Sequence, residues 1–394
     1  MEIFSERLIF LRTTGIICEY NPLHLGHKKQ LTRIRELQGA DSGIVCLMSG
    51  NYVQRGTPAI IDKAARAKAA VLSGADLVLE LPVTVALSSA EGFAAGGVEI
   101  LSGFCDALCF GAESSDGSRL LATAKALLSA DFPAALRAHL EQGLSFPAAR
   151  QAALEFLGQD GTLLKQPNNI LAVEYCKAIL DQKSTMEPLP ILRQGSYHDT
   201  APDPENPSAT ALRQLLSSGD WAAYVPAEAV PCFQNMPLHT LAAGERAILA
   251  RLRCMTDDEF EDLPYGSEGL WRKLMHESRR QASLEEILTA VKSKRYTRTR
   301  LDRMVMCAFL GITAEMLQER APYVRVLALN DRGRDILKKA RQGGRFPNIG
   351  EQQPDSWQKL ENRCSDLYGL FSCNPPEPAG LESGRRIFYM PNIL

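Results

Sequence analysis

Short apolar runs alternate with helix-like patterns through the first part of the chain. The apolar runs have the length and composition of buried strands, and they cover residues 15–18, 43–48, 75–79 and 107–110. The helix-like patterns between them cover residues 25–37, 62–73 and 88–101. Strands that alternate with helices over short connections predict an α/β fold with a Rossmann-like, doubly wound parallel sheet. Ligands of such sheets bind at the loops that follow the strands.

The alternation fades after residue 221, and the remaining sequence is mostly helix-like. Helical patterns cover residues 240–255, 266–281, 284–293 and 299–310, and they resume at 313. The proline- and glycine-rich tail, residues 374–394, is expected to be extended. We therefore predict two domains: an α/β domain over residues 1–225 and a mainly helical domain over residues 226–394.

Composition limits the classes of protein that the sequence can encode. Of the 394 residues, 45% are hydrophobic and 23% are charged, which is typical of a globular protein. The net charge of −2 gives no overall nucleic-acid signal, so any RNA contact has to be local. The 10 cysteines form no CxxC pair, which indicates reduced thiols. Since there is no apolar run of membrane length and no signal-peptide pattern, we expect a cytoplasmic protein without a membrane or an obligate protein partner.

The loop after the first predicted strand has the strongest chemical signal. His24 and His27 flank Gly26 at the point where the strand leads into a helix. A helix N-terminus offers free N–H groups and a positive dipole end, which suit a phosphate. Imidazoles can donate hydrogen bonds to an α-phosphate and stabilise the charge that develops there. Two of the 6 histidines of the chain fall in this window, which favours a catalytic role over a helix cap and a surface residue.

The HxGH motif after a first strand marks the nucleotidylyltransferase and class I tRNA-synthetase superfamily. More narrowly, the segment GIICEYNPLHLGH resembles the bacterial tRNA(Met) cytidine acetate ligase family. The resemblance covers most of the chain in order, through LMSGNYVQRGTPAIIDKAARAKAAVLSGADLVLELPV, FGAES, QPNNILAVEY, SATALR, SEGLWRKL and KSKRYTRTRL. Leu23 and Leu25 stand where the family often has phenylalanine and asparagine, and the chain has a short N-terminal extension. Neither departure alters the histidines or Gly26.

This resemblance implies a two-step reaction that consumes ATP. Acetate is activated as acetyl-adenylate with release of pyrophosphate. The acetyl group then passes to the exocyclic amine of the wobble cytidine of elongator tRNA(Met), which gives N4-acetylcytidine. Mg²⁺ is expected to accompany the phosphates of ATP, and it is assigned no protein ligand. Asp62, Asp76 and Glu80 lie near the expected sheet edge, but a helix N-cap explains Asp62 better, and pairing with a lysine explains Glu80 better.

The resemblance also implies which residues form the nucleotide site. His24 and His27 are the expected catalytic residues. The expected ATP contacts are Gly15, Ile16, Ile17, Cys18, Glu19, Tyr20, Asn21, Pro22, Leu23, His24, Leu25, Gly26, His27, Lys28, Gly111, Asn168 and Arg193. Ser208, Thr210 and Arg213 resemble the second signature of these enzymes, although Ser208 and Thr210 could instead only cap their helix.

Several of these residues have a structural interpretation as well. Gly111 ends a predicted strand, where a ligand can lie against bare backbone, but turns use glycine too. Asn168 and Asn169 follow a proline, and one of them is expected to be the N-cap of the next helix. Asn168 is the preferred ligand contact of the two. Arg193 could bind a phosphate or a carboxylate, or it could form a surface salt bridge.

A basic run in the helical half is the candidate RNA contact. Residues 292–303, KSKRYTRTRLDR, hold 6 basic residues against 1 acid. Such a run can neutralise backbone phosphates, and Tyr296 can stack on an unpaired base; a solvated helix face is the alternative. The anticodon loop fits this chemistry because its bases lie outside a duplex. The expected tRNA contacts are Lys292, Lys294, Arg295, Arg298 and Arg300.

Two other functions remain open at this point. A nucleotidylyltransferase that acts on a small phosphorylated metabolite would keep the HxGH loop, but it leaves the basic run unexplained. A non-catalytic RNA-binding protein would use the basic run, but it leaves the intact HxGH loop unexplained.

Overall fold

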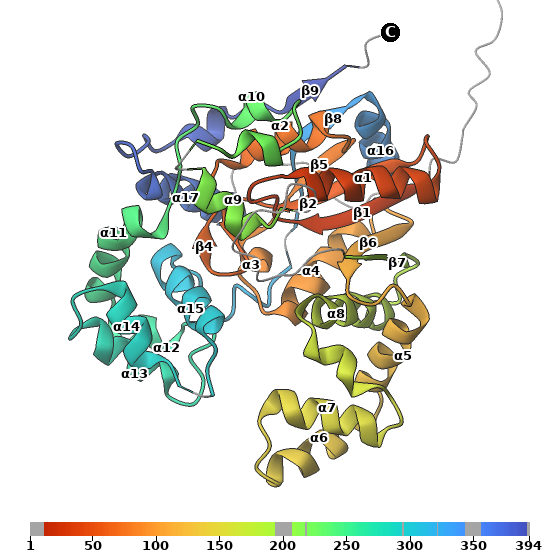
Figure 1. Cartoon of the computed structure of the whole chain (residues 1–394). Coiled ribbons are helices and arrows are strands. Elements are labelled where there is room, and N and C mark those ends of the chain that lie inside the picture. Colours follow the sequence, from red (N-terminus) through yellow and green to blue (C-terminus); the bar gives the residue numbers. More distant parts are fainter. Residues whose placement is uncertain are drawn as a thin grey trace, which may run out of the picture.

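The computed structural model of the chain describes residues 12–193, 207–216, 219–293, 295–320, 322–342 and 356–391. Its central element is a seven-stranded sheet with helices on both faces (Figure 1). The strand order is β7, β6, β1, β2, β5, β8, β9. The predicted doubly wound, Rossmann-like fold is therefore confirmed. The strands are β1 (Thr13–Cys18), β2 (Gly43–Ser49), β5 (Leu77–Leu81), β6 (Ala107–Ala112), β7 (Glu187–Leu192), β8 (Arg325–Asn330) and β9 (Phe388–Met390).

Strand direction determines which edge of the sheet can hold a ligand. The strands from β7 to β5 are parallel, β8 is antiparallel to β5, and β9 is parallel to β8. The chain runs outward from β1 through β2 to β5, and it then returns to β6 and β7 on the other side of β1. Doubly wound sheets bind ligands at this reversal, beyond the carboxyl ends of the strands. A ligand site is therefore expected beyond β1 and β6.

The alternation of side chains along β2 divides the core of the α/β part into two layers. Ile44, Cys46 and Met48 belong to the layer on one face of the sheet, and Val45 and Leu47 belong to the other. The helices of the first layer are α1 (Leu25–Gln38), α2 (Lys63–Leu72) and α10 (Val230–Phe233). Those of the second are α4 (Ala90–Leu101), α8 (Pro167–Asp181) and α16 (Asp331–Gln342), with α5 (Gly117–Leu127) packed on α8.

A small helical lobe projects from the second layer. It consists of α6 (Phe132–Glu141), α7 (Phe146–Phe156) and the 3-10 helix η1 (Gly161–Lys165), and it has an apolar cluster of its own.

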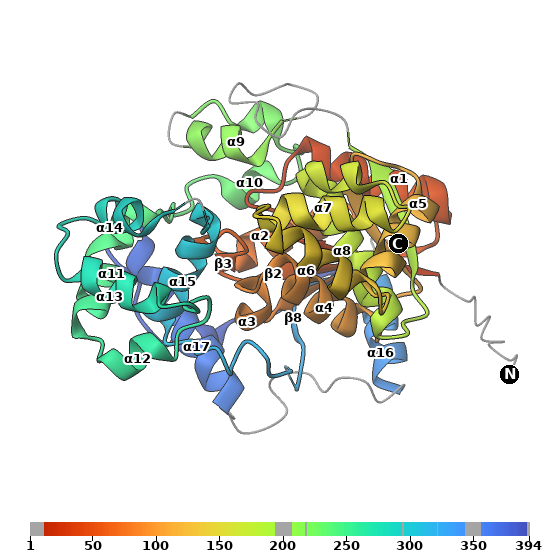
Figure 2. The ribbon, with the colours of Figure 1, turned by 90° about the horizontal axis from the view of Figure 1, so that it is seen from below.

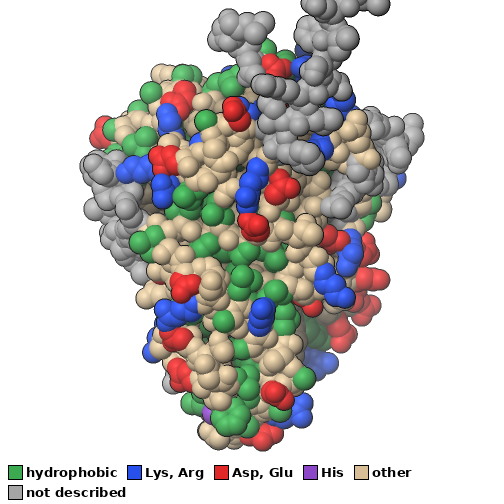
Figure 3. All heavy atoms as spheres, turned by 90° about the vertical axis from the view of Figure 1, so that its right-hand side faces the viewer, with side chains coloured by type: hydrophobic (Ala, Val, Ile, Leu, Met, Phe, Trp, Pro, Cys, Tyr) green, Lys and Arg blue, Asp and Glu red, His purple; other side chains and the backbone are tan. Residues whose placement is uncertain are grey.

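On the side of the molecule shown in Figure 3, cations and anions are mixed with hydrophobic side chains. Because the cations are scattered over the described part of that side, it lacks the basic footprint of an RNA-binding surface.

A second group of helices packs beside the sheet around a separate core. In Figure 2 this group lies to one side of the sheet, and the hairpin of β3 (Tyr52–Val53) and β4 (Thr57–Pro58) lies between them. The predicted helices at 240–255, 284–293 and 299–310 are present in this group. Its helices are α11 (Leu241–Cys254), α12 (Asp257–Glu261), α13 (Leu270–Ser278), α14 (Leu284–Val291), α15 (Arg298–Leu310) and α17 (Ser356–Tyr368).

The sheet takes β8 and β9 from beyond residue 225, where the sequence pattern predicted only helices and an extended tail. Among the described helices, none is both long and apolar enough to cross a bilayer. The remaining short elements are α3 (Val83–Ala86), α9 (Ala209–Leu215), η2 (Ala222–Tyr224), η3 (Gly369–Phe371) and η4 (Leu381–Gly384).

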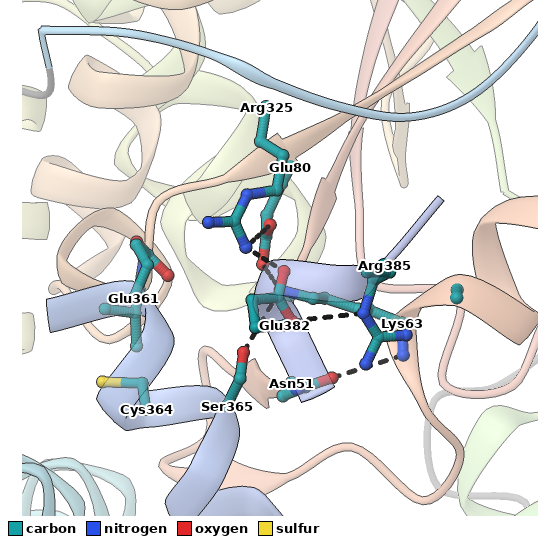
Figure 4. A network of polar contacts seen from close by, with 12 residues as sticks. Asn51, Lys63, Glu80, Arg325, Glu361, Cys364, Ser365, Glu382 and Arg385 are labelled. Carbon is teal, nitrogen blue, oxygen red and sulfur yellow. Dashed lines mark hydrogen bonds and ion pairs between the residues drawn. The ribbon is translucent and has the colours of Figure 1, made fainter. Parts of the chain in front are cut away.

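Buried charges join the sheet to the C-terminal part of the chain (Figure 4). Lys63, at the start of α2, lies 2.7 Å from Glu80 of β5 and 2.9 Å from Glu382 of η4. Arg325 of β8 contacts both carboxylates. The side chains of Lys63 and Glu80 are only 1% and 5% exposed, so each charge needs an opposite charge close by. The predicted pairing of Glu80 with a lysine is thus confirmed.

Lys63→Met is expected to lower the free energy of unfolding by about 3 kcal/mol, because it removes the closest cation from a buried carboxylate. Urea denaturation followed by circular dichroism measures the change. Arg33→Met is the control, since it removes an exposed ion pair with Glu36 and should cost about 1 kcal/mol or less. Equal losses in the two variants would contradict a stabilising role for the buried network.

Candidate active site at the carboxyl end of β1

The HxGH loop connects β1 to α1. Because α1 begins at Leu25, His24 occupies its N-cap position and His27 lies in its first turn. The backbone N–H of His24 donates to Nδ1 of His27 over 3.2 Å, and the two rings stack with their centroids 3.6 Å apart. Since Nδ1 accepts this bond, the proton of a neutral His27 lies on Nε2. That N–H can donate to a ligand at the N-terminus of α1.

Both imidazoles are held neutral. Burial is the main cause, and together with the cations Arg193 and Arg213 it lowers the pKa of His24 to about 3. Burial also lowers the pKa of His27 well below its usual value, with smaller contributions from His24 and Arg193. Nδ1 of His24 is buried and has no hydrogen-bond partner in the described structure. Neutral rings near two guanidinium groups favour hydrogen bonding to an anion.

The loop borders a cavity of about 1700 Å³ at the reversal of the sheet. The ends of β6 and β7, the first turn of α8 and the start of α9 form other parts of its wall. An added Cβ at Gly111 would meet no atom within 4 Å, so bare backbone faces open space there. The predicted nucleotide contacts that line the cavity are Ile16, Ile17, Cys18, Glu19, Tyr20, Asn21, His24, Leu25, Gly26, His27, Lys28, Gly111, Asn168 and Arg193.

Three residues of the predicted segment are not part of this lining. Gly15 faces α4, where an added Cβ would lie 2.9 Å from Cδ1 of Leu101, so it allows close packing of the helix on the sheet. Pro22 and Leu23 are buried, and Leu23 belongs to the apolar layer under α1. The family resemblance implied all residues from Gly15 to Lys28. It did not distinguish the residues that line the cavity from those that pack behind them in the core.

The structure gives Asn168 and Asn169 different positions. Asn168 lines the cavity, and its Oδ1 accepts a hydrogen bond from Arg193 over 3.2 Å. Asn169 is 4% exposed and accepts two backbone N–H groups from the segment after β6. The prediction that one of them is the N-cap was wrong, because α8 begins at Pro167 and Gln166 is its cap. Proline suits the first helical position, where no intrahelical partner exists for a backbone N–H.

The start of α9 closes another side of the cavity. Ser208 caps α9 by accepting a backbone N–H over 3.1 Å, and it also lines the cavity. Arg213 donates to the carbonyl of Asn21 in the HxGH loop and to Oγ1 of Thr210, both over 3.0 Å. Burial is the main cause that lowers the pKa of Arg193 and of Arg213. Two guanidinium groups beside a helix N-terminus, of which that of Arg213 is partly buried, suit an anionic ligand such as a phosphate.

Comparison with known proteins identifies the family of the chain. The model of the HIGH Nucleotidyl Transferase family matches residues 11–379. A tRNA(Met) cytidine acetate ligase of Clostridium novyi is 37% identical over 357 residues, which cover 86% of this chain and 89% of that protein. One of Acetivibrio thermocellus is 33% identical, and the match covers 96% of this chain and 100% of that protein. The chain belongs to the tRNA(Met) cytidine acetate ligase family.

Solved structures agree with this assignment. The apo crystal structure of Thermotoga maritima TmcAL superposes with a TM-score of 0.88 at 28% identity, covering 97% of this chain and 100% of that chain. The crystal structure of TmcAL bound with alpha-thio ATP gives a TM-score of 0.86 at the same identity and coverage. The likeness therefore extends over the sheet and the helical part together.

The sequence analysis did not identify Arg66, whose side chain joins the loops that follow β1 and β2 at the candidate active site. Its buried guanidinium donates to the carbonyl of Glu19 over 2.6 Å, to that of Ser49 over 3.1 Å and to that of Gly50. Its Nε donates to the carbonyl of Ile61 over 2.8 Å. Glu19 follows β1, while Ser49 and Gly50 lie at the end of β2. The available signal was a cation among the alanines on the face of α2 that packs on the sheet.

The acidic residues near the sheet edge have structural partners. Asp62 caps α2 by accepting a backbone N–H over 2.7 Å, as predicted. Asp76 accepts the N–H of Ile44 over 2.7 Å and pairs with Arg35 over 2.6 Å. Within the described ranges, no three His, Cys, Asp or Glu side chains gather in a way that could hold a metal ion.

The predicted RNA-binding run lies outside the cavity. Lys294 falls outside the described residues, and Lys292 is exposed just after α14. Arg295 and Arg298 pair with carboxylates of the same helical group at 2.6 to 2.8 Å. Arg300 donates to a backbone carbonyl over 2.8 Å. The run is therefore partly neutralised by its own domain, and its most exposed described charges are Lys292 and Arg295.

The buried histidines should make folding sensitive to acid. In the unfolded chain His24 takes up a proton near pH 6.5, whereas in the folded chain it does so only near pH 3, so stability falls as the pH drops below 6.5. The loss at pH 5 amounts to about 2 kcal/mol for His24. Between pH 7 and pH 5, His24→Gln is expected to lose less stability than the wild type by that amount, in urea denaturation. His276→Gln, at an exposed histidine, should behave like the wild type. If His24→Gln also matches the wild type, the imidazole is not held neutral.

Proposed function

We propose that this chain is an ATP-dependent ligase that activates acetate as acetyl-adenylate and acetylates the wobble cytidine of elongator tRNA(Met) to N4-acetylcytidine. The observation that carries the proposal is the pair of stacked, neutral histidines at the N-terminus of α1, beside a cavity at the reversal of the sheet. That arrangement suits an α-phosphate under attack. Acetate, cytidine and tRNA(Met) stand in the names of the relatives, and Thermotoga maritima TmcAL was solved with alpha-thio ATP. The acetyl-adenylate and the wobble position of an elongator tRNA are what the family resemblance implies.

In the first step, a carboxylate oxygen of acetate attacks the α-phosphorus of ATP, and the bond from that phosphorus to pyrophosphate breaks. Nε2 of His27 and the free N–H groups of the first turn of α1 donate to the α-phosphate as charge builds up. Arg193 and Arg213 offset the charge of the phosphates. The neutral imidazoles act as hydrogen-bond donors rather than as acids. Mg²⁺, which neutralises part of the phosphate charge when bound, arrives with ATP.

The nucleotide is proposed to lie on the β6 side of the HxGH loop. Gly111 leaves room for it against the backbone. Asn168 and Arg193, joined by a hydrogen bond, are placed to contact its polar groups. The lining residues from Ile16 to Lys28 complete the ATP site.

In the second step, the exocyclic amine of the cytidine attacks the acetyl carbonyl, AMP leaves and the amine loses a proton. No covalent enzyme intermediate is required, so the gain comes from holding the reactants in line. The helical domain, residues 226–394, is proposed to hold the tRNA through its basic run. ATP and tRNA are both cytoplasmic, and we place the protein in the same compartment.

His27→Ala is expected to lower the rate of acetyl-adenylate formation by about 100-fold or more, because it removes a donor to the transition state. The protein is incubated with ATP, Mg²⁺, labelled acetate and unmodified tRNA(Met), and the tRNA is then digested to nucleosides. Label in N4-acetylcytidine from the wild type, and its loss in His27→Ala but not in His276→Ala, supports the ligase. Pyrophosphate release without labelled RNA would point to a metabolite nucleotidylyltransferase, and no use of ATP would point to a non-catalytic RNA-binding protein.

The double substitution Lys292→Ala and Arg295→Ala tests the RNA interface. Its tRNA affinity is expected to fall, and the salt dependence of binding is expected to lessen by about one unit of slope for each phosphate that the protein no longer neutralises. Filter binding over a series of salt concentrations measures both quantities. Arg137→Ala, an exposed cation on α6, is the control and should leave the slope unchanged. An unchanged slope in the double variant would remove these residues from the RNA interface.

A further inference from the structure

The β3–β4 hairpin has no task in the reaction as described so far, yet it borders the cavity. Val53, Arg55 and Thr57 are part of the lining. The N–H of Gln54 donates to the carboxylate of Glu19 in the HxGH loop over 2.9 Å. The hairpin is therefore bonded to the loop that carries the histidines.

The other side of the hairpin is fitted against α15, between the sheet and the helical group (Figures 1 and 2). Gly56 has a φ of +74°, and a Cβ there would lie 2.5 Å from the carbonyl carbon of Asp302. Arg303 donates to the carbonyl of Gln54 over 3.3 Å. Tyr52, at the base of the hairpin, is buried in the core of the helical group. Any side chain at Gly56 would push the hairpin and α15 apart.

Strand order places the hairpin opposite the proposed nucleotide side. The hairpin follows β2, whereas Gly111, Asn168 and Arg193 belong to β6, α8 and the end of β7, on the other side of β1. A second substrate that attacks the acetyl group has to approach from a side that ATP leaves open. The hairpin side meets this condition, and it continues into α15 and the basic run.

The positive charge on the hairpin suits an anionic ligand. Arg55 is exposed at the tip of the hairpin. It lies close enough to Arg213 for its charge to lower the pKa of Arg213, whereas the carboxylate of Glu19 raises that pKa. Two guanidinium groups that border one cavity repel each other, and a phosphate between them relieves that repulsion. In a single-stranded RNA loop, a backbone phosphate lies next to every base that could enter the cavity.

We propose that the β3–β4 hairpin guides the acceptor RNA into the active site. Arg55 binds a backbone phosphate beside the acceptor nucleotide. Gly56 is a positioning residue, because it keeps the hairpin seated on α15 so that RNA held by the helical domain reaches the acetyl-adenylate. The inference rests on the proposed function and adds the route of its second substrate.

The test measures the two half-reactions of the intact protein separately. One is acetate-dependent exchange of pyrophosphate into ATP without RNA, and the other is acetylation of unmodified tRNA(Met). Arg55→Gln is expected to raise the KM for tRNA about tenfold, the effect of removing one hydrogen bond to a charged group, while exchange stays close to the wild-type rate. Arg137→Gln is the control and should change neither reaction. An unchanged KM would overturn the proposal, as would a parallel loss of exchange, which would assign Arg55 to ATP or acetate.

Gly56→Ala is expected to lower kcat for acetylation by about 100-fold with exchange retained, because a small displacement misplaces the attacking amine. Gly143→Ala is the matched control: its φ is +85° and an added Cβ meets no atom within 4 Å, so it shares the backbone strain without the steric clash. Equal effects of the two substitutions on acetylation would overturn the positioning role. Thermal unfolding identifies a variant that fails to fold, and the exposed Arg55→Gln then decides the proposal alone.

Failure of the proposed function is visible before any variant is compared. A wild-type protein that exchanges pyrophosphate but acetylates no tRNA, or that does neither, refutes the ligase, and the inference falls with it. A wild-type protein that performs both reactions leaves the hairpin as the point under test.

Discussion

The geometry of the site depends on the hydrogen bonds that the carbonyl groups at the ends of β1 and β2 accept. A strand that ends loses its ladder partners, and buried carbonyls left without a donor are costly. Arg66 meets this need with one planar guanidinium, whose five N–H groups point in fixed directions. Because Arg66 lies on α2, the position of this helix sets both the HxGH loop and the base of the β3–β4 hairpin. Lys63 fixes the start of the same helix through Glu80 and Glu382.

Burial and the neighbouring cations act together on the histidines, and the cations have a second effect on an anionic ligand. Burial keeps His24 and His27 uncharged, so their N–H groups remain donors without titrating near neutral pH. The positive field comes from Arg193 and Arg213, which sit in the wall and are ionised at every physiological pH. A transition state with spread negative charge gains from both, since fixed donors need no reorganisation when the charge appears.

Local signals were enough to predict the first half of the sheet and the HxGH loop. Apolar runs and helix-like patterns determine β1, β2 and α1 within a few residues, and those elements bring the histidines to the reversal of the sheet. β8 and β9 could not be found this way, because a short apolar run does not reveal a strand partner that is remote in the sequence: β8 pairs with β5, and β9 pairs with β8. Arg66 was missed for a related reason: its partners are backbone carbonyls from three segments, and carbonyls leave no mark in a sequence. The capping of α8 was mispredicted because Pro167 already occupies its first position.

The late position of β8 and β9 affects how the protein can be made. A ribosome delivers the HxGH loop, α2 and β5 first, and residues 325–330 and 388–390 emerge much later. During that interval β5 presents an open edge of unpaired N–H and C=O groups, and Lys63 and Glu80 lack Arg325 and Glu382. The nascent chain thus carries every residue of the nucleotide pocket before it has the strands that finish the sheet beneath it. Until residues 325–330 emerge, the edge of β5 is therefore open to pairing with other chains.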